Sequence, residues 1–405
     1  MRVELKNFLI PTQPRVTHKV VEPNVSAVVP TYKPGATALR LVNDLLRYNP
    51  KLAVVVVDDC TPQDYAPSAP VLDALRAMGP RVTVLRTPHN RLKAGALNMG
   101  LAHLLAHKGP YAPAVILTLD DDVVVAPETI QRMTEALLSD PRLAAVCSAC
   151  RVLNKNTNLL TRLQGLEYVG FNAIRLGDQG FLYGPLVMHG MFTAFRVRAL
   201  RQAGPFAEGH LIEDYEMTTR LKVLGWHVRA VLGAPAWTEV PERLSGFWRQ
   251  RTRWSLGGVQ VVLSAGRPIA VLQDILGHVM FVATLGVIAV LMLVDGGGAP
   301  SLLLKVLIIL SVVQFISWYV LQLWLMRWYE EKDAWDWALR ISIVPELLFS
   351  SIMTVVLLGS YAYMGFAYVA RGLSRLGRVG GHIAKLGITL FAKLGYSGGW
   401  GTRAD

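Results

Sequence analysis

An apolar run at residues 114–117 leads into three consecutive acids, Asp120 to Asp122. Carboxylates at the end of a buried strand carry a large desolvation cost unless a cation lies beside them. A divalent metal that also binds phosphate oxygens would supply that charge. The alternative is an acidic cluster that caps a helix beginning near Pro127, and the rest of the chain has to decide between the two.

The three acids are not expected to be equivalent. Side chains along an extended strand point alternately to its two faces. Asp120 and Asp122 should therefore point into one site, whereas Asp121 should point away and matter less. Asp121→Asn is then the natural control for Asp122→Asn.

Composition divides the chain into a charged first part and an apolar last part. Of its 405 residues, 52% are hydrophobic and 17% are charged, which is typical of a membrane protein. The net charge of +12 fits the basic flanks of membrane segments better than nucleic-acid binding, because the positive residues cluster near those segments. Cys147 and Cys150 are interpreted as small buried thiols, since neither a second CxxC nor a His pair accompanies them.

Apolar strands alternate with amphipathic helices over the first 240 residues. This order predicts an α/β domain with a mostly parallel sheet and crossover helices. Neither a GxGxxG turn nor a GxxxxGK[ST] loop follows the strands, which argues against a nicotinamide-binding domain and a P-loop NTPase. The expected strands are 25–30, 52–57, 82–85, 114–119 and 143–146 with a strand pair at 184–195, and the expected helices are 36–48, 71–78, 94–107, 158–174 and 213–224.

The strand ends carry the polar residues. Ligands of an open parallel sheet bind at the carboxyl ends of its strands. Thr31 and Tyr32 follow the first strand, Asp58 ends the second, and the acids from Asp120 onward follow the fourth. These groups are expected to meet in one crevice.

Two further features belong to the candidate site. Glu213 and Asp214 open a helix, where the helix dipole favours acids, so simple capping is the alternative to a catalytic role. Gly190 would allow a close approach of the backbone. Together with His189 and the loop 177–185, it is expected to line the ligand pocket of such a site.

The last third of the chain reads as a membrane region. Residues 241–270 are rich in Arg and Trp, which predicts amphipathic interface helices. The stretches 275–294, 306–326 and 347–368 are each near the length of a bilayer crossing. Three crossings would put the basic tail, 371–405, on the outer side, against the preference of positive charge for the cytoplasm. Either the third stretch is re-entrant or interfacial, or a fourth crossing exists, or the charge rule fails here.

Four short motifs occur in order, namely Asp58, Asp120-x-Asp122, Glu213-Asp214 and Gln250-Arg-Thr-Arg253-Trp254. Together they resemble the signatures of membrane-integrated family 2 glycosyltransferases, which include cellulose, chitin, hyaluronan and bacterial poly-N-acetylglucosamine synthases. The resemblance covers about residues 24–260 and the membrane segments that follow. It implies a GT-A fold and an inverting transfer from a nucleotide-diphosphate sugar, with a UDP-sugar as the expected donor.

The resemblance also implies roles for individual residues. Asp214 would be the general base, with Glu213 beside it. Asp122 would bind Mg²⁺ or Mn²⁺, and Asp120 would serve both the metal and the nucleotide. The other residues implied to bind donor or acceptor are Thr31, Tyr32, Asp58, Lys93, Gln250, Arg253 and Trp254, alongside Gly190 in the sugar pocket.

The expected activity is sugar transfer to a growing polysaccharide at the inner or plasma membrane, with the catalytic domain in the cytoplasm. The alternative is addition of one or a few sugars to a lipid acceptor, because three crossings enclose a polymer channel only if subunits associate as a homo-oligomer. A membrane-anchored binding protein with an inactive transferase fold is a third hypothesis, against which the intact acids argue. The expected partners are a nucleotide-sugar, a saccharide or lipid-linked acceptor and the lipid bilayer, without nucleic acid.

The expected units follow from these patterns. No crossing is expected before the catalytic domain. The units are a leader at 1–23, a GT-A domain at 24–240, interface helices at 241–270, a transmembrane region at 271–370 and a basic tail at 371–405.

Overall fold

The computed structural model of the chain describes residues 24–108, 112–179, 182–294, 302–375 and 377–396. The expected leader and the end of the expected tail, 397–405, lie outside these ranges. The strands are β1 (Val25–Thr31), β2 (Ala53–Asp58), β3 (Val82–Arg86), β4 (Val115–Leu119), β5 (Val124–Val125), β6 (Leu143–Val152), β7 (Phe192–Arg196) and β8 (His227–Thr238). The helices are α2 (Ala36–Tyr48), α3 (Ala69–Arg76), α4 (Leu92–Ala106), α5 (Thr129–Leu138), α6 (Leu159–Gly177), α7 (Val197–Ala203), α8 (Glu213–Val223), α9 (Leu244–Ser264), α10 (Leu272–Val294), α11 (Leu302–Leu325), α12 (Ala334–Ser342), α13 (Val344–Leu373) and α14 (Gly377–Lys393).

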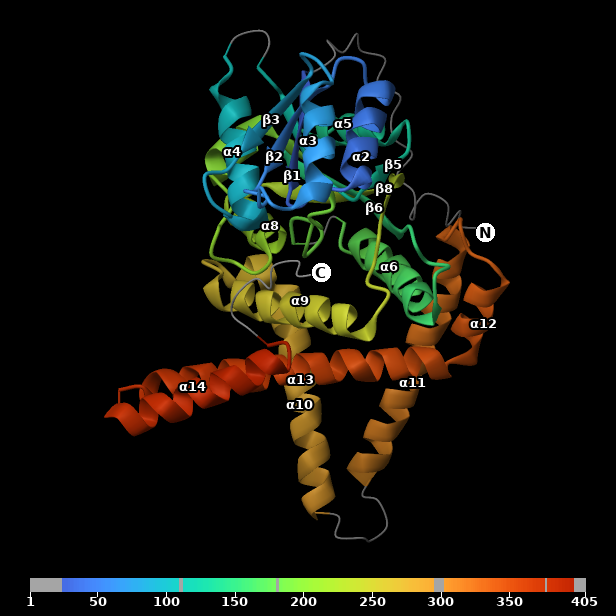
Figure 1. Ribbon diagram of the computed structural model, residues 1–405. Coiled ribbons are helices and arrows are strands. Elements are labelled where there is room, and N and C mark those ends of the chain that lie inside the picture. Colours follow the sequence, from blue (N-terminus) through green and yellow to red (C-terminus); the bar gives the residue numbers. More distant parts are fainter. Residues whose placement is uncertain (1–23, 109–111, 180–181, 295–301, 376, 397–405) are drawn as a thin grey trace, which may run out of the picture.

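The strands form one mixed, mostly parallel sheet in the order β3-β2-β1-β4-β7-β6-β8-β5 (Figure 1). The first four strands pair in parallel, and β7 runs antiparallel between β4 and β6. The register places Thr31 beside Asp58 and Asp58 beside Arg86. The carboxyl ends of β2, β1 and β4, which are neighbours and pair in parallel, therefore meet at one edge, as the sequence predicted.

Both faces of the sheet are covered by helices, which explains the unbroken apolar runs. Along β2, Val54 and Val56 pack into the core under α2 and α5, whereas Val55 and Val57 pack into the core under α4 and α8. All four side chains are at most 2% exposed. Burial of each such side chain contributes about 1.5–3 kcal/mol.

The expected strand pair at 184–195 is wrong, because β7 is its strand and residues 184–191 form turns and irregular backbone. The N–H groups of this segment bind side chains of α8 instead of a sister strand. Met188 N–H donates to Thr218 Oγ1 at 3.2 Å, and Gly190 N–H donates to Asp214. By contrast, α2 has the predicted bounds, and Gly225, with φ +85°, follows the end of α8 as expected. Cys147 and Cys150 are buried free thiols, as interpreted.

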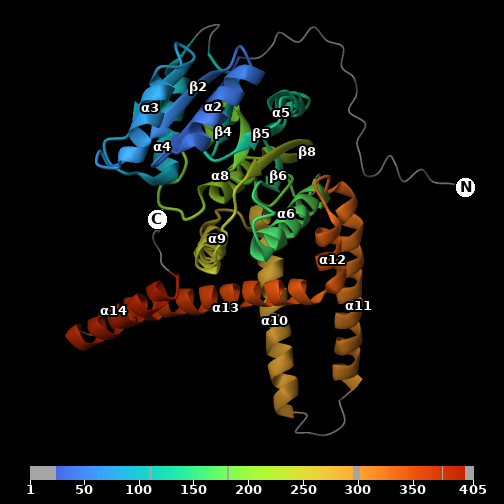
Figure 2. The ribbon, with the colours of Figure 1, turned by 45° about the vertical axis from the view of Figure 1, so that its right-hand side comes forward.

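The C-terminal helices extend from one side of the α/β domain. Two helical segments, 304–328 and 347–373, are long and apolar enough to cross a membrane by length and composition. In both views α10 and α11 extend away from the sheet, while α13 lies across α10, and α14 lies to one side of it (Figures 1 and 2). Buried ion pairs tie this region to the domain: Asp336 of α12, fully buried, lies 2.6 Å from Lys155 Nζ and 2.9 Å from Arg162 Nη1.

Candidate active site

Lys93, in the first turn of α4, lies at the centre of the candidate site. Its Nζ lies 2.5 Å from Asp120 Oδ1 and 3.3 Å from Glu213 Oε1. The same ammonium donates to the carbonyl oxygen of Gly190 at 3.1 Å. Burial acts to lower the pKa of Lys93, but the carboxylates of Asp120, Glu213 and Asp214 outweigh it and raise that pKa above its usual range. Lys93 is therefore a permanent cation among the acids that the sequence singled out.

Asp214 is held at the start of α8 by two backbone N–H groups. Its Oδ2 accepts from Gly190 N–H at 2.6 Å, and its Oδ1 accepts from Tyr215 N–H at 2.7 Å. Burial and the adjacent charge of Glu213 raise the pKa of Asp214 to about 6, although Lys93 acts in the opposite direction. A carboxyl group with a pKa near the operating pH is suited to general base catalysis.

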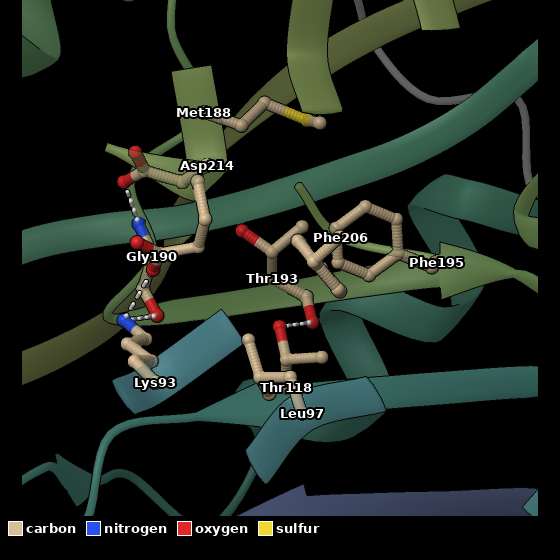
Figure 3. Close-up of a pocket in the computed structure, with 10 residues that line it drawn as sticks. Lys93, Leu97, Thr118, Met188, Gly190, Thr193, Phe195, Phe206 and Asp214 are labelled. Atoms are coloured by element: carbon tan, nitrogen blue, oxygen red, sulfur yellow. Dashed lines mark hydrogen bonds and ion pairs between the residues drawn. The ribbon is translucent and has the colours of Figure 1, made fainter. Parts of the chain in front are cut away.

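Gly190 lies between these two side chains (Figure 3). A Cβ at this position would lie 2.7 Å from Lys93 Nζ and 3.1 Å from Asp214 Oδ2, so any other residue would displace the cation or the acid. The neighbouring His189 donates from Nε2–H to the carbonyl oxygen of Ser148 at 2.7 Å. Burial, aided by the charge of Arg175, lowers the pKa of His189 to about 3, so this imidazole stays neutral.

A pocket opens beside this cluster, with a polar wall and an apolar wall. The charged side chains come from α4 and α8, two threonines come from β4 and β7, and the apolar side chains come mainly from β7 and the loops around it (Figure 3). The lining residues are Lys93, Leu97, Thr118, Met188, Gly190, Thr193, Phe195, Phe206, Glu213 and Asp214.

Asp58, at the end of β2, organises the loops around the crevice. Its fully buried carboxylate lies 2.5 Å from Arg86 Nη1 and accepts from Thr61 N–H at 3.0 Å. The next residue, Asp59, directly follows the end of β2. Its Oδ1 accepts from Arg91 N–H at 2.8 Å, directly before α4, and thereby holds the entry to the helix that carries Lys93.

Asp120 pairs with Lys93, whereas Asp121 has a partner of its own. Thr31 Oγ1 donates to Asp121 Oδ2 at 2.5 Å, and Asp121 is 8% exposed. This contact joins the ends of β1 and β4, so Asp121 is not a neutral control. Asp122 lies half-buried in the turn between β4 and β5, and Tyr32 lies half-buried after β1.

The acids fit a metal that is shared with a substrate. In the described ranges, His, Cys, Asp and Glu side chains do not gather in groups of three that could hold a metal ion. Asp120 and Asp122 offer hard oxygen ligands of the kind that Mg²⁺ and Mn²⁺ prefer. Further oxygens from a nucleotide diphosphate would complete such a coordination sphere.

The motif helix α9 packs against the segment that leads into Glu213. Gly257 admits the side chain of Ile212, since a Cβ there would lie 2.6 Å from Ile212 Cγ1. Arg253 Nη1 donates to the carbonyl oxygen of Leu211 at 3.4 Å. The motif is thereby fixed relative to the acids at the start of α8.

Arg251, within the motif, was missed by the sequence reasoning. It is fully buried, and its Nη2 lies 2.5 Å from Glu167 Oε2 of α6. Its guanidinium lies 4.1 Å from the ring centre of Trp254, and its Nη1 donates to Gln250 Oε1 at 3.2 Å. Arg251 thus contacts two of the residues to which the motif assigns substrate binding. The available signal was its helical phase, one turn after the buried Phe247.

Comparison with known proteins gives a family match over more than half of the chain. The model of the glycosyl transferase family group 2 matches residues 115–367. Poly-beta-1,6-N-acetyl-D-glucosamine synthase of Staphylococcus aureus (strain COL) is 30% identical over 174 residues, which are 43% of this chain and 40% of the relative. The synthase of the same name from Staphylococcus epidermidis is 29% identical over the same shares. The chain therefore spans about 40% of the length of these curated relatives.

A solved structure shares the fold. A mannosyltransferase from Pyrobaculum calidifontis, in complex with GDP-Man and Mn²⁺, aligns with a TM-score of 0.54 at 21% identity. The alignment covers 76% of this chain and 86% of that one. This likeness establishes the GT-A fold that the sequence predicted.

Proposed function

The chain belongs to the family 2 glycosyltransferases, and we propose that it transfers a sugar from a nucleotide-diphosphate sugar by an inverting single displacement. The observation that carries the proposal is the position of Asp214. Its carboxylate is oriented by Gly190 N–H, lies in the same pocket as Lys93 and has a pKa raised to about 6. A base and a fixed cation in one pocket are what a proton-coupled displacement of a diphosphate requires.

In this mechanism Asp214 accepts the proton of the acceptor hydroxyl while that oxygen attacks the anomeric carbon. The bond between the anomeric carbon and the diphosphate oxygen breaks on the opposite face, and the electron pair leaves with the diphosphate. Each oxygen of Asp214 accepts one backbone N–H bond and retains a lone pair for the hydroxyl. General base catalysis of this kind accelerates a reaction by about 10²–10⁴-fold.

The leaving diphosphate needs positive charge. We assign Lys93 and Arg253 to charge-assisted bonds with its oxygens. Asp120 and Asp122 would hold Mg²⁺ or Mn²⁺, which would neutralise the developing charge on the phosphates. Asp58, Thr31 and Tyr32 would border the nucleotide, as the resemblance to family members implies.

A UDP-sugar is the proposed donor and a growing polysaccharide the proposed acceptor. The curated relatives are poly-beta-1,6-N-acetyl-D-glucosamine synthases, so a polymer of N-acetylglucosamine is the first product to test. We propose residues 24–240 as the catalytic domain, on the cytoplasmic side of the inner or plasma membrane. Residues 241–270 would be the interface helices that follow it.

One observation favours a second candidate, in which one or a few sugars are added to a lipid acceptor. Of the long apolar helices in the described ranges, α10 and α11 extend away from the domain, whereas α13 lies across α10 (Figure 2). Two helices cannot enclose a polymer channel within one chain. Radiolabelled donor should give high-polymer material if a polysaccharide is made, and organic-extractable product if a lipid is glycosylated.

The decisive test is turnover of UDP- and GDP-sugars by the purified chain with Mg²⁺ or Mn²⁺. Asp214→Asn should abolish transfer and retain nucleotide binding, because the amide cannot act as a base. Glu216→Gln is the matched control, since Glu216 lies in the same helix turn and pairs with Arg220. Absence of turnover by the wild type with every donor and both metals, or full activity of Asp214→Asn, would reject the proposal.

A further inference from the structure

The last two helices form a close-packed antiparallel hairpin. Phe366 of α13 lies against Gly387 of α14, and Tyr396 lies against Gly359, at distances that leave no room for a Cβ on either glycine. The hydroxyl of Tyr396 also donates to Val356 O at 3.2 Å. Within the hairpin, α13 lies across α10 in both views (Figures 1 and 2). The family match ends at residue 367, so α14 lies beyond it.

The face of α14 that turns away from α13 carries two parallel stripes. The apolar stripe is spaced at four, three and four residues, and its members are 50–73% exposed. The polar stripe lies beside it and is also exposed. The apolar stripe is Val379, Ile383, Leu386 and Leu390, and the polar stripe is His382, Lys385, Thr389 and Lys393.

The charge of this region has one sign. Residues 347–404 contain no acidic residue, whereas six basic residues occur among them: Arg371, Arg375, Arg378, Lys385, Lys393 and Arg403. An amphipathic helix with an apolar stripe and a basic stripe binds in the plane of a membrane whose headgroups are anionic. Neither a nucleic acid nor an acidic protein accounts for the apolar stripe as well.

The hairpin also contacts the motif helix. Trp248 Nε1 donates to Leu394 O at 2.7 Å, and Thr252 Oγ1 donates to Gly395 O at 3.0 Å. The rings of Trp248 and Tyr396 meet edge to face, with their centres 6.2 Å apart. The turn after α14 therefore holds the helix that carries Gln250, Arg253 and Trp254.

We propose that α13 and α14 lie in the membrane interface and that α14 binds anionic lipid headgroups through Lys385 and Lys393. The hairpin, held at the membrane in this way, stabilises the position of the motif helix α9 through the turn after α14. α10 and α11 are then the two crossings, and α13 lies in the interface although its segment 347–373 is long and apolar enough to cross. In this arrangement the basic tail and the catalytic domain lie on the same side of the membrane. The preference of positive charge for the cytoplasm is then satisfied. This inference rests on the proposed membrane function.

The first test locates α14 in the bilayer. The full chain, with Cys60→Ser, receives a fluorescent label at Leu386→Cys or, as a matched control, at Thr389→Cys, and is reconstituted in phosphatidylcholine and phosphatidylglycerol vesicles. Lipids with brominated acyl chains should quench the label at position 386 strongly and the label at 389 weakly. Equal quenching at both positions would indicate a crossing helix, and no quenching would indicate a helix in water or against a second copy. Either result would overturn the proposal.

The second test concerns headgroup charge and the coupling to α9. Lys385→Glu and Lys393→Glu should each lower the affinity of the chain for vesicles that contain phosphatidylglycerol about fivefold. Lys108→Glu, on the exposed surface of the catalytic domain, should leave that affinity unchanged. Trp248→Phe keeps an aromatic ring but removes the N–H group that donates to Leu394. It should therefore lower the rate of sugar transfer, while the label at position 386 is still quenched. Unchanged affinity in both lysine variants contradicts the inference.

Sugar transfer in the same vesicles separates the two proposals. Transfer without quenching at position 386 would reject the interfacial helix alone. Quenching without any transfer by the wild type would reject the proposed activity alone.

Discussion

The fully buried Arg251 and the half-buried Glu167 form an ion pair, with Nη2 2.5 Å from Oε2, that joins the motif helix to α6. The same guanidinium lies over the ring of Trp254. Arg251, which lies between the motif residues Gln250 and Arg253, therefore orients the side chain of Trp254, which is proposed to face the acceptor.

We expect Arg251→Met to destabilise the protein by about 1–3 kcal/mol, because it leaves the half-buried carboxylate of Glu167 without its partner. Arg251→Met combined with Glu167→Met should recover much of that stability while transfer stays low, since Trp254 has lost its support. Thermal unfolding and initial rates measure the two effects separately. Equal stability of the single and double variants would show that the unpaired carboxylate of Glu167 carries no such cost.

The pH dependence of transfer should report Asp214. The base must be ionised, and its pKa is raised to about 6, so the rate should fall about tenfold per unit as the pH drops below that value. Glu213→Gln removes a like charge and should move the inflection to lower pH. A profile whose acid limb is identical in wild type and Glu213→Gln would contradict the assignment.

Gly190→Ala should abolish most of the activity and leave the fold intact. The new methyl group would lie 2.7 Å from Lys93 Nζ and 3.1 Å from Asp214 Oδ2, so one of them has to move. Gly277→Ala, in α10, is the matched control, because a Cβ there meets nothing within 4 Å. Circular dichroism and transfer rates of both variants test this expectation, and an active Gly190→Ala would overturn it.

Asp121 and Asp122, which follow β4, should have different roles, the first in stability and the second in metal binding. Asp121→Ala removes the acceptor of Thr31 and should lower stability by about 1–3 kcal/mol. Asp122→Asn should leave stability nearly unchanged and raise the Mn²⁺ concentration needed for half-maximal transfer. Unfolding curves and metal titrations of both variants distinguish the roles. If Asp121→Ala and Asp122→Asn behave alike in both measurements, the division is wrong.

The meeting of Thr31, Asp58 and Asp120 at one edge of the sheet could be predicted from the chain. Strand runs such as Val54–Val57 are recognisable because both faces are buried, and the order of strands and helices then places their carboxyl ends together. Once the strand ends are known, the polar residues that follow them must lie along the same edge of the sheet. The motif assignments of Asp214 and Gln250 rest on the resemblance to family members.

The contact of Asp121 with Thr31 and that of Arg251 with Glu167 could not be predicted. The first pair is 90 residues apart in the sequence and the second is 84 residues apart. A periodic pattern shows which face of an element a side chain occupies, but it does not show which residue packs against that face. The backbone of 184–191 was misread for the same reason, since its N–H groups bind side chains of a distant helix.

By itself, the sequence determined the α/β order, the acids at the strand ends, the motif helix and the apolar length of the C-terminal segments, because all of these depend on local composition and spacing. Tertiary structure decided which acid faces Lys93, which faces Thr31, and that α13 lies across α10 instead of beside it. Hydropathy measures how much apolar surface a helix has, whereas its direction depends on the residues it packs against, here Phe366 on Gly387 and Trp248 on the turn after α14.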